Sequence, residues 1–204
     1  MACRTGAATA GLERGRDGCA RPHRAAAAVA SCRVAPTAAL ATALLLACAA
    51  ALDWREVQPE GTDAVALFPC RPHTLERSVV LAGRTVPMSL HACSAGGRTW
   101  ALAVAPLGDP TLVTAALEAM RRAAAANVGA ATGSRRLPLD VRGATPNAAS
   151  GREELRGRLP DARTVVEQLA VFTRGTTVYQ ATVFGAALPA EDADTFFASL
   201  RVGT

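Results

Sequence analysis

The chain has 204 residues, half of them hydrophobic, so it is long enough to bury one ordinary core. Its formal net charge is +5, and arginine supplies every basic residue because the sequence contains no lysine. The apolar content and the lack of a short repeat exclude fibrous, collagen-like and wholly disordered chains. A single long apolar stretch excludes a membrane protein with several spans.

Most of the net charge lies in the first 51 residues. Six arginines there face two acidic residues, a net of +4, whereas the remaining residues carry +1. The body of the chain is therefore almost neutral, and Tyr179 is its only tyrosine for stacking on bases. We expect no nucleic-acid partner.

Residues 1–51 are predicted to be a disordered extension followed by a signal peptide. Arg33 precedes an apolar run at residues 34–52, and small residues end it, which is typical of a secretory signal. The run is rich in alanine, which favours a cleaved signal; an uncleaved membrane anchor is the alternative. The irregular residues 1–32 also fit translation that starts further downstream, at Val29 or Val34.

Two processing routes are open. Leu45-Leu46-Ala47-Cys48 resembles a bacterial lipobox, in which Cys48 would carry lipid and tether the protein to a membrane. Ala49-Ala50-Ala51 instead fits ordinary signal peptidase, with cleavage before Leu52. By either route we expect residues 52–204 to form an exported domain, in the periplasm or anchored on the periplasmic side of a membrane.

The pattern of residues 52–204 indicates a single α+β domain. Five strands with short turns come first and are expected to be mostly antiparallel. A helix follows, which Asp109-Pro110 begins and Asn127 and Gly129 end. After a loop come three or four strands and a second helix at residues 190–200. The predicted strands span residues 52–57, 64–68, 75–81, 86–93, 99–105, 136–141, 153–159, 163–173 and 176–184, with a short one at 201–202.

We therefore predict a mostly antiparallel sheet of about seven to nine strands with two main helices packed on it. The first helix is expected to turn one apolar face to the core. That predicted face consists of Leu112, Ala115, Ala116, Ala119 and Met120.

Four stretches of the body resemble the PsbP-like superfamily and small exported proteobacterial proteins of unknown function. They are residues 52–57, Leu67-Phe68-Pro69, residues 174–179 with a Gly turn and a Tyr, and residues 196–201 with two Phe and a Ser-Leu-Arg tail. The resemblance implies an α/β/α sandwich. It brings no catalytic residue, so it informs the fold more than the function.

Cys70 and Cys93 are the only cysteines of the body, and a predicted hairpin separates them. In an exported protein such a pair commonly forms a disulfide, which would stabilise the fold by about 3 kcal/mol. Two independent buried thiols are the alternative.

The same cysteines offer a second hypothesis together with His73 and His91. Cys-x-x-His followed by His-x-Cys supplies the ligands of a tetrahedral zinc site, and Met88 would suit copper. Oxidation of the cysteines would remove both thiolates, and the histidines are also typical of polar residues near turns. Our first expectation is no metal and no other cofactor.

No motif of a known reaction is present. The sequence has no Gly-x-Ser-x-Gly nucleophile turn and no phosphate-binding glycine loop. Glu153 and Glu154 are adjacent on a predicted strand, so they point to opposite faces and form no carboxylate pair. We expect a non-enzymatic binding or accessory module for a protein or small ligand of the cell envelope. The alternative is a metal-handling or redox protein that uses Cys70, His73, His91 and Cys93.

Overall fold

The computed structural model of the chain describes residues 52–129 and 134–203. The predicted extension and signal segment, including Cys48 and both candidate processing sites, lie outside the described residues. Neither α-helix of the described part is long and apolar enough to cross a membrane. The elements are β1 (Arg55–Val57), β2 (Ala64–Phe68), β3 (His73–Leu81), β4 (Arg84–Ala95), β5 (Arg98–Pro106), the 3-10 turn η1 (Pro110–Leu112), α1 (Val113–Asn127), β6 (Arg135–Leu137), β7 (Gly151–Arg158), β8 (Thr164–Arg174), β9 (Thr177–Gly185), α2 (Ala190–Ala198) and β10 (Arg201–Val202).

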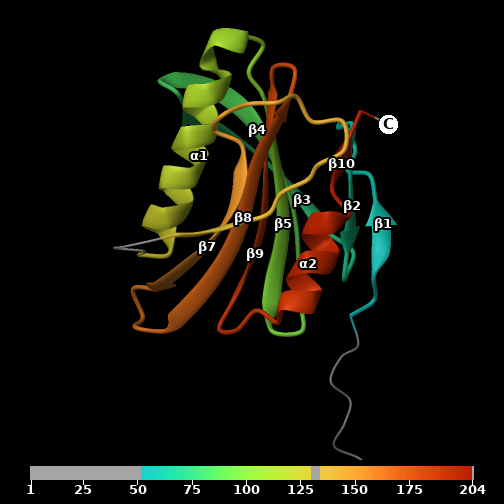
Figure 1. The fold of residues 1–204 in the computed structure, drawn as a ribbon, viewed down its shortest axis with the longest axis vertical. Coiled ribbons are helices and arrows are strands. Elements are labelled where there is room, and N and C mark those ends of the chain that lie inside the picture. Colours follow the sequence, from blue (N-terminus) through green and yellow to red (C-terminus); the bar gives the residue numbers. More distant parts are fainter. Residues whose placement is uncertain (1–51, 130–133, 204) are drawn as a thin grey trace, which may run out of the picture. The chain divides into compact units, whose positions relative to one another are not determined.

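Two antiparallel sheets form the fold (Figure 1). The larger has seven strands in the order β3-β4-β5-β9-β8-β7-β6, and the smaller has three in the order β1-β2-β10. The predicted α+β class and antiparallel pairing are thus confirmed. The first five strands do not form one meander, however, because the chain changes sheet between β2 and β3. Pro69 and Pro72 occupy that connection and prevent the second strand from running on into the third.

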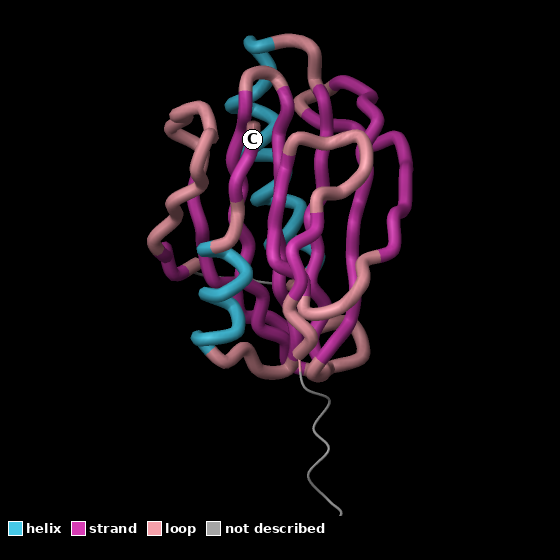
Figure 2. The backbone as a smooth tube through the Cα atoms, turned by 90° about the vertical axis from the view of Figure 1, so that its right-hand side faces the viewer, coloured by secondary structure: helices cyan, strands magenta, loops and turns pink. Residues whose placement is uncertain are grey.

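The large sheet is covered on both faces. Helix α1 packs on one, called the α1 face, while α2 and the small sheet pack on the other, the α2 face. In the side view of Figure 2, α1 lies behind the strands and the shorter α2 in front. Strand β5 shows why both layers are needed. Trp100, Leu102 and Val104 point to the α2 face, and Ala103 and Ala105, at alternate positions, point to the α1 face.

The first helix begins as predicted, and its core face differs from the predicted one at Ala115: Ala116 and Met120 are buried, and Leu112 and Ala119 pack against the same core. The carboxylate of Asp109 accepts a hydrogen bond from the Thr111 backbone N–H at 2.9 Å, and Pro110 starts the 3-10 turn that leads into α1. Ala115, expected in the core, is exposed. Alanine marks a helix face poorly because it is small and present on all sides of this helix. The buried residues of α1 are Val113, Ala116, Leu117, Met120 and Ala124.

Aromatic rings connect the layers on the α2 face. Phe196 of α2 is fully buried, and its ring meets those of Phe68 and Trp100 edge-on at centroid distances of 5.4 and 5.6 Å. These contacts join α2 to the small sheet through Phe68 and to the large sheet through Trp100. Trp54 packs edge-on against Trp100 at 5.3 Å, just before β1.

Two strands have a boundary that differs from the prediction by more than two residues. The first strand begins at Arg55 rather than Leu52. Before it, Leu52 and Trp54 pack against the core, and Asp53 donates its backbone N–H to the Pro69 carbonyl at 3.1 Å. The short edge strand covers Arg135–Leu137 rather than residues 136–141. The predicted second helix, strand β8, strand β9 and the terminal pair Arg201–Val202 are found with ends shifted by at most two residues.

The aromatic contacts lead to a stability prediction. Replacing Phe196 with Ala removes a fully buried ring from the junction of three layers, and we expect a loss of about 3–5 kcal/mol in the free energy of unfolding. The matched control is Leu75→Ala on the edge strand β3, where the side chain is 56% exposed and the expected change is within about 0.5 kcal/mol. Urea unfolding followed by far-UV circular dichroism measures both. Similar losses for the two variants would contradict the layer model.

Candidate functional site

The predicted disulfide is present. Cys70, which follows β2, is bonded to Cys93 of β4, and the two Cα atoms lie 6.0 Å apart. The bond therefore links the connection that leaves the small sheet to a strand of the large sheet. Both thiols are consumed in this state.

The four residues of the metal hypothesis do not come together. His73 pairs with Ala92 and His91 with Thr74 in the β3-β4 ladder, so the two imidazoles point to opposite faces. Met88 is buried on the α1 face, away from Cys93 on the α2 face. Within residues 52–129 and 134–203, no group of three or more His, Cys, Asp and Glu side chains is placed to hold a metal ion.

His91 instead belongs to a short polar chain inside the α2 face. Its Nδ1 atom lies 3.0 Å from the Thr74 hydroxyl and its Nε2 atom 3.3 Å from the Ser89 hydroxyl. Burial lowers the pKa of His91, and the nearby Glu76 partly opposes this. A groove of about 500 Å³ beside β1 is lined in part by Thr74 and His91. The charged residues that line it are both acidic and basic, so they favour neither an anionic nor a cationic ligand.

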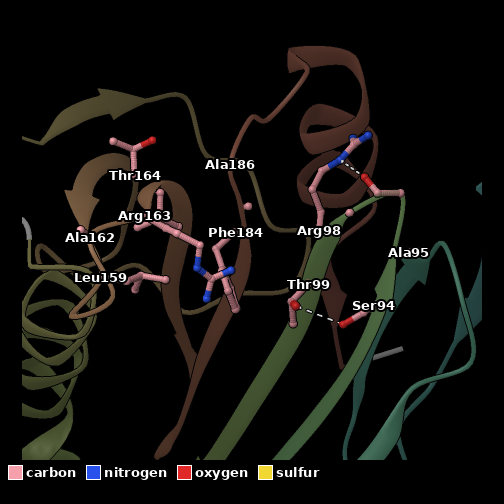
Figure 3. A pocket seen from close by; sticks show the side chains of 14 residues that line it. Ser94, Ala95, Arg98, Thr99, Leu159, Ala162, Arg163, Thr164, Phe184 and Ala186 are labelled. Carbon is pink, nitrogen blue, oxygen red and sulfur yellow. Dashed lines mark hydrogen bonds between the residues drawn. The ribbon is translucent and has the colours of Figure 1, made fainter. Parts of the chain in front are cut away.

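A larger groove, of about 930 Å³, lies at one end of the large sheet; we call it the end groove (Figure 3). The β4-β5 turn forms one wall and the β7-β8 turn the other, with the last residues of β9 between them. Phe184 of β9 lies in the groove and is 37% exposed, although it belongs to a strand that is otherwise largely buried.

Turn chemistry shapes both walls. Gly96 and Gly97 supply the positive φ values that the β4-β5 turn requires. In the β7-β8 turn, Leu159 donates its backbone N–H to the Arg163 carbonyl at 2.9 Å, and Asp161 accepts from the Arg163 backbone N–H at 3.1 Å. At Gly185 a Cβ atom would lie 2.8 Å from Arg98 Cγ, so glycine lets β9 end close against the opposite wall.

The strand register places Glu167 beside the end groove. Glu167 of β8 pairs with Phe184 of β9, which pairs in turn with Thr99 of β5. The side chain of Glu167 points to the α1 face and is 5% exposed. Burial, and then the negative charge of Glu153, raise the pKa of Glu167 to about 7.

Glu153 is the diagonal neighbour of Glu167 and has the opposite environment. The Arg121 guanidinium of α1 donates to both carboxylate oxygens of Glu153, at 2.8 and 2.9 Å, and these bonds lower the pKa of Glu153 despite its burial. Glu154 points to the face opposite Glu153, as predicted; this is the α2 face, where Glu154 meets Arg135, Arg156 and Gln168. The Glu153–Glu167 pair cannot be recognised from neighbours on one strand, because it depends on the β7-β8 register.

No protein-family model matches this chain, and no curated protein matches its sequence. The candidate site therefore rests on the geometry of the end groove and its surroundings.

The disulfide can be tested by counting thiols. In the unfolded, unreduced protein we expect Cys93→Ala to show one more titratable thiol than the wild type, because it frees Cys70. The double variant Cys70→Ala/Cys93→Ala should show no additional thiol, since the other cysteines are shared. Both variants should lose about 3 kcal/mol of stability. Fewer thiols in the variants than in the wild type would contradict the bond.

The raised pKa of Glu167 predicts a pH-dependent stability. Because the folded-state pKa moves from 4.5 to about 7, the folded protein binds this proton more tightly than the unfolded chain does. The free energy of unfolding should therefore fall as pH rises from 4.5 to 7, by on the order of 3 kcal/mol from this group, and then level off. Glu167→Gln should remove this contribution and be the more stable protein above pH 7.

Urea unfolding at several pH values, compared between wild type and Glu167→Gln, measures this contribution. His91, with its lowered pKa, contributes stability that is lost as pH falls below 6.5, but it is present in both proteins and cancels in the difference. A stability difference that stays constant from pH 4.5 to 8 would contradict the assignment to Glu167.

Proposed function

We propose that this chain is a non-enzymatic exported protein that acts as a binding module of the cell envelope and holds an apolar ligand in the end groove. The observation that carries the proposal is Phe184, an exposed aromatic ring in a concave site lined mainly by apolar residues. Aromatic side chains in grooves bury much ligand surface at little cost in side-chain entropy, so they are common anchors for ligands.

The rigidity of the groove also supports a binding role. Its walls are the turns of two long hairpins, β4-β5 and β7-β8, and β9 between them pairs along its length with both β5 and β8. A site built on paired strands needs little reorganisation to receive a ligand, which favours affinity.

Export remains part of the proposal. The cationic and apolar pattern of residues 1–51 supports it, and the Cys70–Cys93 disulfide is compatible with an oxidising compartment. The metal-handling alternative would require reduction of that disulfide and a rotation of His73 to the opposite face of β3, so we do not favour it.

We also propose that the fold is PsbP-like. Helix α1 on one face and α2 on the other suit an α/β/α sandwich. Three of the resembling stretches also have clear structural positions: Phe68 ends β2, Gly175 lies in the β8-β9 turn, and Phe196 fills the core of the α2 face.

The binding proposal is tested with a neutral apolar fluorophore, N-phenyl-1-naphthylamine, whose emission rises in an apolar site. We expect saturable binding to the wild type, with an affinity lowered about tenfold, or 1.4 kcal/mol, by Phe184→Ala. Leu75→Ala serves as the control, because it removes an exposed apolar side chain outside the end groove. Equal binding by the wild type and a folded Phe184→Ala variant would overturn the proposal.

A further inference from the structure

The charged residues that line the end groove are all basic. Arg98 on the β4-β5 wall and Arg163 on the β7-β8 wall are the two ionisable side chains among the lining residues. Glu167, the cross-strand neighbour of Phe184, is buried beside the groove and does not line it. An apolar site with only cationic lining groups favours a ligand that carries negative charge.

Arg98 already has its partners. Its guanidinium pairs with Asp192 of α2 and donates from Nε to the Gly96 carbonyl at 3.0 Å. The Arg98 and Asp192 side chains are only 15% and 21% exposed. Arg98 therefore fastens α2 to the β4-β5 turn, and Figure 3 shows its guanidinium at the carbonyl of that turn.

Arg163 is different because only one of the two hydrogen-bonding edges of its guanidinium has a partner among the described residues. Its Nε atom donates to Asp161 at 2.6 Å, while its side chain is 75% exposed. In the described part of the chain, no hydrogen bond is made by its two terminal Nη groups. A guanidinium offers donors along two edges, so Asp161 can hold the Nε edge and orient the group while the Nη edge receives a carboxylate in bidentate fashion.

The side chain of Arg163 lies close to the apolar residues of the end groove. Figure 3 shows its side chain extending from the β7-β8 turn toward β9, where Phe184 lies. Val165 and Leu159 line the same wall. One ligand in the groove would therefore meet an aromatic and aliphatic surface together with one oriented guanidinium.

We propose that the ligand of the end groove is an amphipathic carboxylate, a fatty-acid anion whose chain lies over Phe184 and Val165 and whose head group binds the Nη edge of Arg163. The proposal rests on the binding function proposed above and adds the class of ligand. Arg163 is the residue that distinguishes an acid from an alcohol of the same chain length.

The experiment compares decanoate with decanol, each displacing N-phenyl-1-naphthylamine from the full chain at pH 7.5 and low salt. The wild type is expected to bind decanoate about tenfold more tightly than decanol. Arg163→Gln should abolish that preference and leave decanol binding unchanged, since glutamine removes the charge and keeps a polar side chain. Arg122→Gln is the matched control. Arg122 is also an exposed arginine with one carboxylate partner, Glu118, and it does not line the groove.

The outcomes separate the two proposals. If N-phenyl-1-naphthylamine shows no Phe184-dependent binding, the binding function fails and this inference fails with it. If the fluorophore binds but decanoate does not displace it, only the carboxylate inference is overturned. If both bind equally and Arg163→Gln changes neither, the groove remains a binding site and the carboxylate inference is overturned. If Arg122→Gln weakens decanoate as much as Arg163→Gln does, the preference reflects net charge rather than a head-group contact, which also overturns the inference.

Discussion

The fold depends on the need to bury both faces of the two central strands. Strands β5 and β9 carry apolar side chains at consecutive positions, so neither can face water on one side. Helix α1 meets this need on one face, and α2 with the three-stranded sheet meets it on the other. Helix α1 covers its face less completely near the end of the sheet, where Phe184 is partly exposed. The end groove is thus a consequence of how the two faces are covered.

Arginine fastens the covering elements to the sheet. Arg121 ties α1 to Glu153 of β7, and Arg98 ties α2 to the β4-β5 turn through Asp192. Arg152 of β7 reaches Asp194 of α2 at 2.7 Å, with its guanidinium 4.1 Å from the centre of the Phe197 ring. These contacts use the planar guanidinium, which can stack and donate several hydrogen bonds at once, whereas an ammonium group would supply only a point charge.

Local patterns predicted the elements well because they depend on neighbouring residues. Alternation in residues 176–184, the glycines at 96 and 97 and the Asp109-Pro110 start of the first helix all act within a few positions. The features that were predicted wrongly, or not predicted at all, depend on contacts between distant parts of the chain. Ala115 was wrongly assigned to the core face of α1 because Ala115 and Ala116 look alike until the sheet beneath them is known. The Glu153–Glu167 pair and the end groove both require the register of strands that lie far apart in sequence.

The β4-β5 turn has two structural roles, because the start of the described chain also packs against it. Leu52, the first described residue, packs beside Gly96 in the β4-β5 turn: a Cβ atom on Gly96 would lie 3.1 Å from Leu52 Cδ2. That turn is a wall of the end groove. A change in the length of this turn would therefore alter the shape of the groove and the packing of Leu52 together.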